Sequence, residues 1–236
     1  MLDTILFDLD GTLLPMDQTD FVRAYVTQLC RRYVPCGYDK DLIVKALWAG
    51  NDAMVRNDGT CPNEKRFWDC FNALLGDTQL IRDTIPDFYA KEFDEIKAVT
   101  APSPLAREII DTLKDKGYTL VLATNPLFPP EGVQTRLSWI GLTPEDFSLV
   151  TTYDNSTFCK PSPDYYREIL GKIDKAPEQC RMVGNNPLED LSAAKLGFDV
   201  YFVTDYIENE QNVPTDGFPQ GPLSSVLTWS RALQAL

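Results

Sequence analysis

Two aspartates near the start of the chain, Asp8 and Asp10, have a spacing that could support chemistry on a bound cation or a shared proton. They belong to the segment ILFDLDGTLL (residues 5–14) and follow three apolar residues directly. Because strand side chains alternate in direction, both carboxylates project to one side if the extended path continues. Like charges that close repel, so either a cation lies between them or one carboxylate holds a proton. A solvated turn is the alternative interpretation, because Asp and Gly are favoured turn residues.

Polar residues also stand next to later apolar runs. Thr124 and Asn125 follow YTLVLA, and Lys160 opens the segment KPSPD ahead of a helical pattern. The turn GNNPLED contains Asn185 and Asp190 after the run CRMV. Taken singly, such a Thr usually caps a turn and such a Lys is usually solvated. Their shared position at strand ends is what suggests a common site.

The elements that must position these residues follow an alternating pattern. Strand-like runs occur at residues 4–8, 118–124, 147–152, 180–185 and 198–204. Helical patterns separate or follow them, at residues 105–117, 164–173, 188–197 and 224–236. This alternation predicts an α/β fold with a Rossmann-like parallel sheet. Open parallel sheets bind ligands at the carboxyl ends of their strands, where the polar residues are expected to lie.

The stretch from residue 15 to 101 interrupts the alternation, because it contains no convincing strand. Four helical patterns fill it, at residues 21–34, 41–48, 63–76 and 78–97, with Asn63 as a plausible N-cap and Gly76 as a plausible C-terminal residue of the third. We therefore predict an all-α cap domain over residues 15–101, inserted into a core domain made of residues 1–14 and 102–236. The Pro-rich sites at 102–104 and 126–130 are interpreted as hinge and loop.

Composition excludes several functional classes. The 236 residues include no histidine, which rules out Ser-His-Asp and Cys-His nucleophile systems and His-ligated zinc. A formal net charge of −13 disfavours nucleic acid as a partner, since duplex binding depends on Lys and Arg. Six cysteines without a C-x-x-C pair or a secretory leader predict free thiols in a reducing cytoplasm. No apolar stretch approaches the ~20 residues of a membrane helix, so no membrane partner is expected.

The order of the four polar segments resembles the motif sequence of the haloacid dehalogenase-like (HAD) hydrolase superfamily. Asp-x-Asp-Gly-Thr comes first, then Thr-Asn, Lys-Pro and a Gly-Asn acidic turn, so that the resemblance covers residues 4 to about 204. The FDLDGTLL match is the most specific of them. The dehalogenase branch resembles D-x-x-G-T without a second Asp, so Asp10 favours the phosphatase branch. The fold implied is an α/β core with a helical cap between the first two motifs.

The resemblance implies a role for each residue. Asp8 would attack phosphorus and become an aspartyl-phosphate, and Asp10 would act as general acid and base. Thr124 and the backbone amide of Asn125 would hold phosphoryl oxygens, while Lys160, the one cation expected in the site besides the metal, would neutralise charge. The implied cofactor is Mg²⁺.

The metal ligands implied are the Asp8 carboxylate, the backbone carbonyl of Asp10 and the GNNPLED turn. Asn185 is a departure, because many family members have an Asp ligand there. An amide oxygen can still coordinate Mg²⁺, and Glu189 or Asp190 could supply the missing charge through water. Which of Asn185 and Asp190 is the direct ligand stays open.

Three functions fit these motifs. The first is a Mg²⁺-dependent phosphatase of a small phosphorylated metabolite, the second a sugar phosphomutase, and the third a binding or regulatory protein with weak turnover, for which Asn185 is the only hint. Trp48, Asn51, Arg56 and Phe128 are candidate substrate contacts, although Trp48 and Phe128 are equally well explained by packing. The oligomeric state is not predicted.

Overall fold

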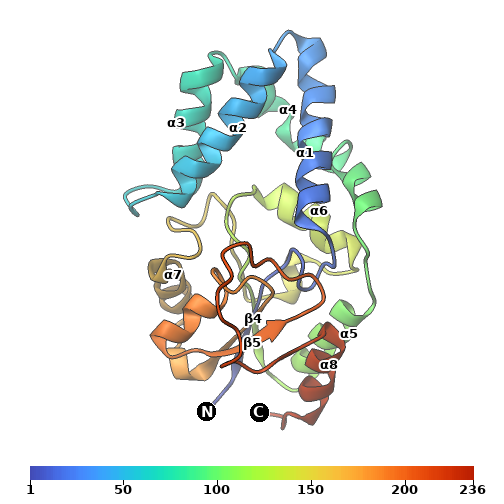
Figure 1. The fold of residues 1–236 in the computed structure, drawn as a ribbon, viewed down its shortest axis with the longest axis vertical. Coiled ribbons are helices and arrows are strands. Elements are labelled where there is room, and N and C mark those ends of the chain that lie inside the picture. Colours follow the sequence, from blue (N-terminus) through green and yellow to red (C-terminus); the bar gives the residue numbers. More distant parts are fainter.

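A six-stranded parallel sheet forms the centre of the molecule in the computed structural model, which describes all residues 1–236 (Figure 1). The strand order is β3-β2-β1-β4-β5-β6, and every pairing is parallel. The strands are β1 Thr4–Phe7, β2 Thr119–Leu122, β3 Leu149–Val150, β4 Cys180–Gly184, β5 Asp199–Val203 and β6 Gln220–Gly221. The predicted α/β parallel fold is confirmed, and β6 is an addition that the sequence patterns did not indicate.

Helices cover both faces of this sheet because its central strand is apolar on both sides. Ile5 and Phe7 pack with α5 (Leu105–Asp115), α6 (Pro130–Trp139) and α8 (Leu223–Ala232). Leu6 points the other way and packs with α7 (Pro163–Ile173) and the 3₁₀ segment η5 (Leu191–Leu196). All three side chains are fully buried. An uninterrupted apolar run is the sequence pattern expected of such a two-sided strand.

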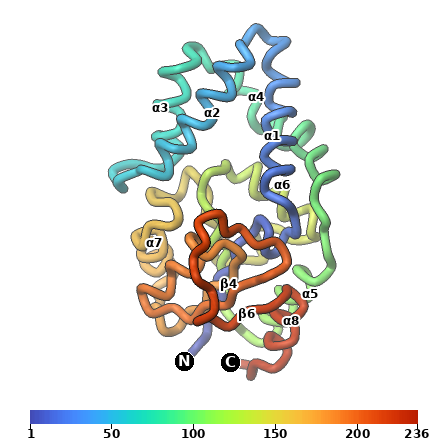
Figure 2. The backbone as a smooth tube through the Cα atoms, viewed as in Figure 1, coloured from blue at the N-terminus to red at the C-terminus, as the bar shows by residue number.

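A layer of helices lies beyond the carboxyl edge of the sheet, at the end of the molecule opposite both chain termini (Figures 1 and 2). This helical layer consists of α1 (Gln18–Tyr33), η1 (Val34–Cys36), α2 (Lys40–Val55), α3 (Asn63–Leu75), α4 (Gln79–Ala90) and η2 (Asp94–Val99). Its two connections to the sheet run together, since Met16 and Thr100 form an antiparallel bridge and Ala101 N donates to Pro15 O at 2.8 Å. The division into a core and a cap domain at residues 14/15 and 101/102 stays a prediction.

Two local expectations were wrong, and one helix was not predicted. The loop predicted at 126–130 extends to Pro129, and helix α6 follows it from Pro130, a proline in the first turn, where no N–H is needed. Residues 188–197 form a turn followed by η5, in which Ala193 N bonds to Asp190 O three residues earlier. Asn63 is the first residue of α3 rather than its cap. Its side chain is buried, accepting from Asn57 Nδ2 at 2.8 Å and donating to Cys159 Sγ at 3.3 Å.

Other features agree with the sequence. Gly76 ends α3 with a φ of 82°, a value that favours glycine. All six cysteines are unpaired. None of the helices combines the length and the apolar character needed to cross a membrane.

Candidate active site

Four loops meet where the strand order reverses, between β1 and β4. Asp8 follows β1, Thr124 and Asn125 follow β2, and Asn185 follows β4. Lys160 lies three residues before α7 and reaches the same point. Because this reversal leaves a crevice at the carboxyl ends of the strands, it is the usual ligand site of such sheets. The structure therefore gathers the predicted site residues at one edge.

A buried lysine links two of the loops. Lys160 Nζ donates to Asp8 Oδ1 at 2.8 Å and to Asp190 Oδ1 at 2.6 Å, and Lys160 is only 1% exposed. Burial raises the pKa of Asp8, because loss of hydration outweighs the attraction of Lys160. Burial would lower the pKa of Lys160, but the charges of Asp190 and Asp8 raise it, so that the lysine is a cation. The ion pair fixes the carboxylate of Asp8 at the end of β1.

Both carboxylate oxygens of Asp190 accept hydrogen bonds, and one of these comes from Lys160. Its Oδ2 accepts from Asn186 N at 2.9 Å, so both carboxylate oxygens are engaged. A Cβ on Gly184 would overlap the Asp190 carboxylate, which explains why glycine stands there. Asn125 completes the arrangement, because its Oδ1 accepts from Lys160 N at 3.3 Å and its Nδ2 donates to Glu189 Oε1 at 3.1 Å.

Asp10 has a partner that the sequence did not predict. Arg136 on α6 is completely buried, and its Nη1 forms an ion pair with Asp10 Oδ2. The guanidinium lies 4.2 Å from the centre of the Phe128 ring, and its Nε donates to Gly132 O at 3.2 Å. Burial raises the pKa of Asp10, while Arg136 and Lys160 act to lower it. The expectation that Lys160 is the only cation of the site besides the metal was therefore wrong.

One sequence signal could have revealed Arg136. Val133 and Leu137 on α6 and Ile140 just after it are buried, and Arg136 stands three residues after the first and four before the last. An arginine within an apolar stripe at helical spacing points into the core, where a charge must be paired. This signal is weak, because the helix is short and prolines stand before it and at its first position.

Asn185 is placed by two hydrogen bonds. Its Oδ1 accepts from Thr12 Oγ1 at 2.9 Å, and its Nδ2 donates to the backbone oxygen of Tyr206. Gly11 has a φ of 77°, and any Cβ there would overlap the Asn185 amide. An aspartate at position 185 would set a carboxylate oxygen against the Tyr206 carbonyl. The amide is thus explained by its neighbours, without invoking a loss of activity.

The site contains more acidic side chains than basic ones. The charges of Asp190 and Asp10 act to raise the pKa of Asp8, and burial raises the pKa of both Glu189 and Glu208 to about 7. Asp10 Oδ1 is buried without a hydrogen-bond partner. No three acidic or thiol side chains converge as a preformed chelate. Mg²⁺ needs no such chelate, since it is usually held by one or two carboxylates, water and substrate phosphate.

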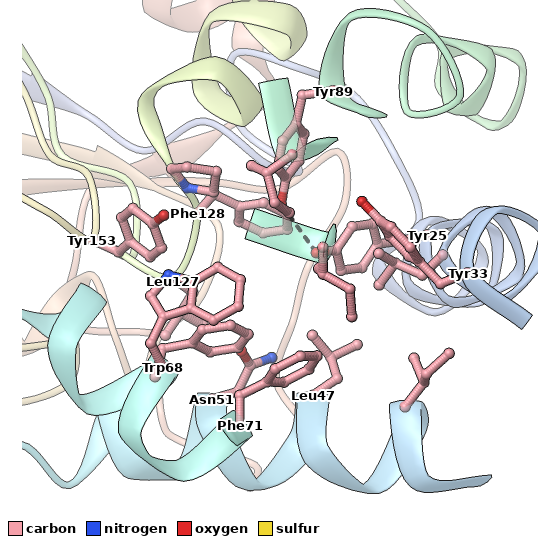
Figure 3. A pocket seen from close by; sticks show the side chains of 16 residues that line it. Tyr25, Tyr33, Leu47, Asn51, Trp68, Phe71, Tyr89, Leu127, Phe128 and Tyr153 are labelled. Carbon is pink, nitrogen blue, oxygen red and sulfur yellow. Dashed lines mark hydrogen bonds between the residues drawn. The ribbon is translucent and has the colours of Figure 1, made fainter. Parts of the chain in front are cut away.

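Two hollows adjoin this edge of the sheet. A polar cleft of about 550 Å³ lies between the base of α1 and the segment after β5, and Asp17, Glu208 and Glu210 are among its lining residues. An apolar cavity lies between the helical layer and the loops that follow β2 and β3, and it includes the candidates Asn51 and Phe128 (Figure 3). Of the other two candidates, Trp48 is 48% exposed and Arg56 forms an ion pair with Asp52, so neither lines the cavity.

Replacing Arg136 by methionine should lower the free energy of unfolding by about 3–5 kcal/mol, because it leaves the Asp10 carboxylate buried without its cation. Urea denaturation monitored by circular dichroism measures this loss. The double variant R136M/D10N should regain part of it, since the uncompensated charge is then absent.

Arg181→Met is the matched control. Arg181 also lies over an aromatic ring, 4.7 Å from the centre of Trp229, and also pairs with an aspartate, but Asp199 is exposed. An exposed pair contributes about 0–1 kcal/mol, so this variant should unfold almost like the original protein. Equal losses in both variants would show that burial of the Asp10 pair is energetically unimportant.

The sheet and the charged residues gathered at its carboxyl edge define an α/β protein with a ligand site at its strand ends. Residues 2–197 match the family model described as haloacid dehalogenase-like hydrolase. The chain belongs to this family, as the motifs predicted.

Known proteins resemble most or all of the chain at low identity. Pyrophosphatase PpaX of Bacillus pumilus is 24% identical over 210 residues, covering 89% of this chain and 87% of that protein. The bifunctional riboflavin kinase/FMN phosphatase of Arabidopsis thaliana is 26% identical over 185 residues, covering 76% of this chain and 42% of that protein. The crystal structure of a HAD phosphatase from Thermococcus onnurineus superposes with a TM-score of 0.62 at 17% identity, covering 100% of both chains.

Proposed function

We propose that this protein is a Mg²⁺-dependent phosphatase that hydrolyses a small phosphorylated metabolite through an aspartyl-phosphate on Asp8. The observation that carries the proposal is the buried contact of Lys160 with Asp8 and Asp190 beside the Asp10–Arg136 pair. These contacts hold the Asp8 carboxylate, and Asp10 two residues later, at the ligand-binding edge of the sheet. Relatives named as a pyrophosphatase and as a riboflavin kinase/FMN phosphatase support the reaction class.

In the first step, Asp8 attacks the phosphorus of the ester. A bond forms between a carboxylate oxygen and phosphorus, the bond from phosphorus to the leaving oxygen breaks, and Asp10 donates a proton to that oxygen. The hydroxyl of Thr124 and the backbone amide of Asn125 hold phosphoryl oxygens. Lys160 keeps Asp8 in line and balances negative charge. Asp10, held by Arg136, has one unpartnered oxygen for the proton transfer.

In the second step, Asp10 takes a proton from water, which attacks the phosphorus and releases phosphate with restoration of Asp8. The excess of carboxylates fits a divalent cation, which the Asp8 carboxylate, the Asp10 backbone carbonyl and Asn185 would hold. When bound, such an ion would supply positive charge to the phosphoryl oxygens. Asp190 stays a candidate ligand, but its two hydrogen-bonded oxygens favour a role in holding Lys160.

The test is hydrolysis of p-nitrophenyl phosphate, monitored by release of p-nitrophenol. We expect activity with Mg²⁺, loss of at least about 100-fold on removal of metal by EDTA and dialysis, and recovery on adding Mg²⁺ back. Undiminished activity without metal would refute the cofactor assignment. Absence of hydrolysis with every phosphate ester tested would refute the phosphatase assignment, and isomerisation of a sugar phosphate would identify a phosphomutase instead.

A further inference from the structure

The apolar cavity lies at the boundary between the helical layer and the sheet, rather than inside the helical layer alone. Twelve of its 16 lining residues belong to α1, α2, α3 and α4, and the other four are Leu127, Phe128, Pro129 and Tyr153 from the loops after β2 and β3 (Figure 3). A packing defect within the helices would be lined by the helices only. This cavity instead has a wall built from the same loop that contains Thr124 and Asn125.

The lining is apolar and aromatic. Fourteen of the 16 residues are hydrophobic, and no Lys, Arg, Asp or Glu is among them. Two of the tyrosine hydroxyls, those of Tyr25 and Tyr89, bond to each other at 3.0 Å, so these residues offer their rings to a ligand. The amide of Asn51 on α2 and the indole N–H of Trp68 are the polar groups besides the tyrosine hydroxyls. A charged group placed here would lose its hydration without gaining a counter-ion.

A short chain of contacts joins the cavity to the proposed chemistry. Phe128 lines the cavity, its ring lies 4.2 Å from the guanidinium of Arg136, and Arg136 pairs with Asp10. Leu127, the next residue of the wall, donates from its backbone to Asn125 O at 2.8 Å. The leaving group of the ester departs on the side of the proton donor. Phe128 and Arg136 thus connect the wall of the cavity to Asp10, the proposed proton donor.

The alternative location does not suit an anionic leaving group either. The polar cleft between the base of α1 and the segment after β5 has Asp17, Glu208 and Glu210 in its lining and no Lys or Arg. The acidic side chains of the polar cleft would repel a second phosphate or a carboxylate on the substrate. In the apolar cavity the same group would have no counter-ion. Substrates charged at both ends, such as the pyrophosphate for which the Bacillus pumilus relative is named, fit neither hollow.

We propose that the apolar cavity receives the leaving group, and that the substrate is a phosphate monoester of a small alkyl or aryl alcohol without a second charge. This inference rests on the proposed phosphatase function. The free volume is about 50 Å³, roughly a third of the ~150 Å³ of an engineered cavity that binds benzene. A short alkyl chain enters directly, whereas a ring requires side chains of the helical layer to move apart.

The first experiment compares kcat/KM for the alkyl phosphates from ethyl to hexyl phosphate, whose leaving groups are nearly equal in intrinsic reactivity. We expect kcat/KM to rise about fourfold with each added methylene until the cavity is filled. Pyrophosphate and phosphoglycolate should react at least about tenfold less efficiently than butyl phosphate. A flat alkyl series, or a preference for either doubly charged compound, would overturn the inference.

Ile85→Lys tests whether the cavity causes the preference. Ile85 is half-buried on α4 and lines the cavity, whereas Leu80 lies on the same helix, is 45% exposed and does not line it. The ratio of kcat/KM for hexyl to ethyl phosphate should fall at least about tenfold in Ile85→Lys and stay unchanged in Leu80→Lys. This ratio is independent of the fraction of folded enzyme, so partial unfolding cannot imitate the effect. An unchanged ratio in Ile85→Lys contradicts the assignment.

The two proposals can fail separately. Hydrolysis of p-nitrophenyl phosphate together with a flat alkyl series overturns the leaving-group assignment and keeps the phosphatase. If no ester is hydrolysed, the phosphatase proposal fails, and calorimetry with ethyl and hexyl phosphate decides about the cavity. Tighter binding of hexyl phosphate then supports an apolar ligand site, and equal binding refutes it.

Discussion

Asp8→Asn should lower kcat for p-nitrophenyl phosphate at least about a thousandfold, equivalent to about 4 kcal/mol of transition-state stabilisation. The amide has the same shape as the carboxylate but is a far poorer nucleophile, and Lys160 keeps Asp190 as a partner. Because burial raises the pKa of Asp8, the ionised group is unfavourable in the folded protein. The variant should therefore unfold at the same or a higher denaturant concentration than the original enzyme.

Asp3→Asn provides the control for this experiment. Asp3 lies just before the opposite end of the same strand and also binds a lysine, with 2.9 Å between Asp3 Oδ2 and Lys175 Nζ. Its replacement should leave kcat within about twofold. Mass spectrometry of acid-quenched reactions should detect a phosphoryl group on the original enzyme and on Asp3→Asn, but not on Asp8→Asn. Near-normal turnover by Asp8→Asn would refute the nucleophile assignment.

Lys160→Met should have two separable effects. Turnover should fall about 100–1,000-fold, because the charge opposite the phosphoryl group is lost. The free energy of unfolding should fall by about 3–5 kcal/mol, because the carboxylates of Asp8 and Asp190 stay buried without their shared cation. Steady-state kinetics with an aryl and an alkyl phosphate measures the first effect, and urea denaturation measures the second.

Lys175→Met is the matched variant, since Lys175 pairs with Asp3 at the far edge of the sheet and both side chains are partly exposed. We expect a stability loss of about 1 kcal/mol or less and ordinary turnover. A Lys160→Met enzyme that is impaired with only one class of substrate would show that the lysine serves specificity. One that is less stable but fully active would limit its role to holding the fold together.

Local sequence was sufficient for most of the core because its signals are short-range. The run before Asp8 is apolar on both faces, and the glycine after it has the positive φ that such a turn favours. Helices α5 and α7 show the apolar spacing of their buried faces. By contrast, the turn after Asn185 contains an acid that bonds across the sheet to Lys160, 30 residues earlier, and no local pattern encodes that contact.

By itself, the sequence determined the parallel α/β core, the helical stretch that interrupts it, and the strand ends that carry Asp8 and Thr124. Helix and strand propensity and the spacing of apolar residues depend on residues that are close in the sequence, so they can be recognised from the sequence alone. Only the tertiary structure decided that Arg136 binds Asp10, 126 residues away, and that an uncharged aromatic cavity adjoins the same edge. The physical reason is burial. A charge removed from water needs a partner, and which partner it meets depends on how helices pack across the sheet.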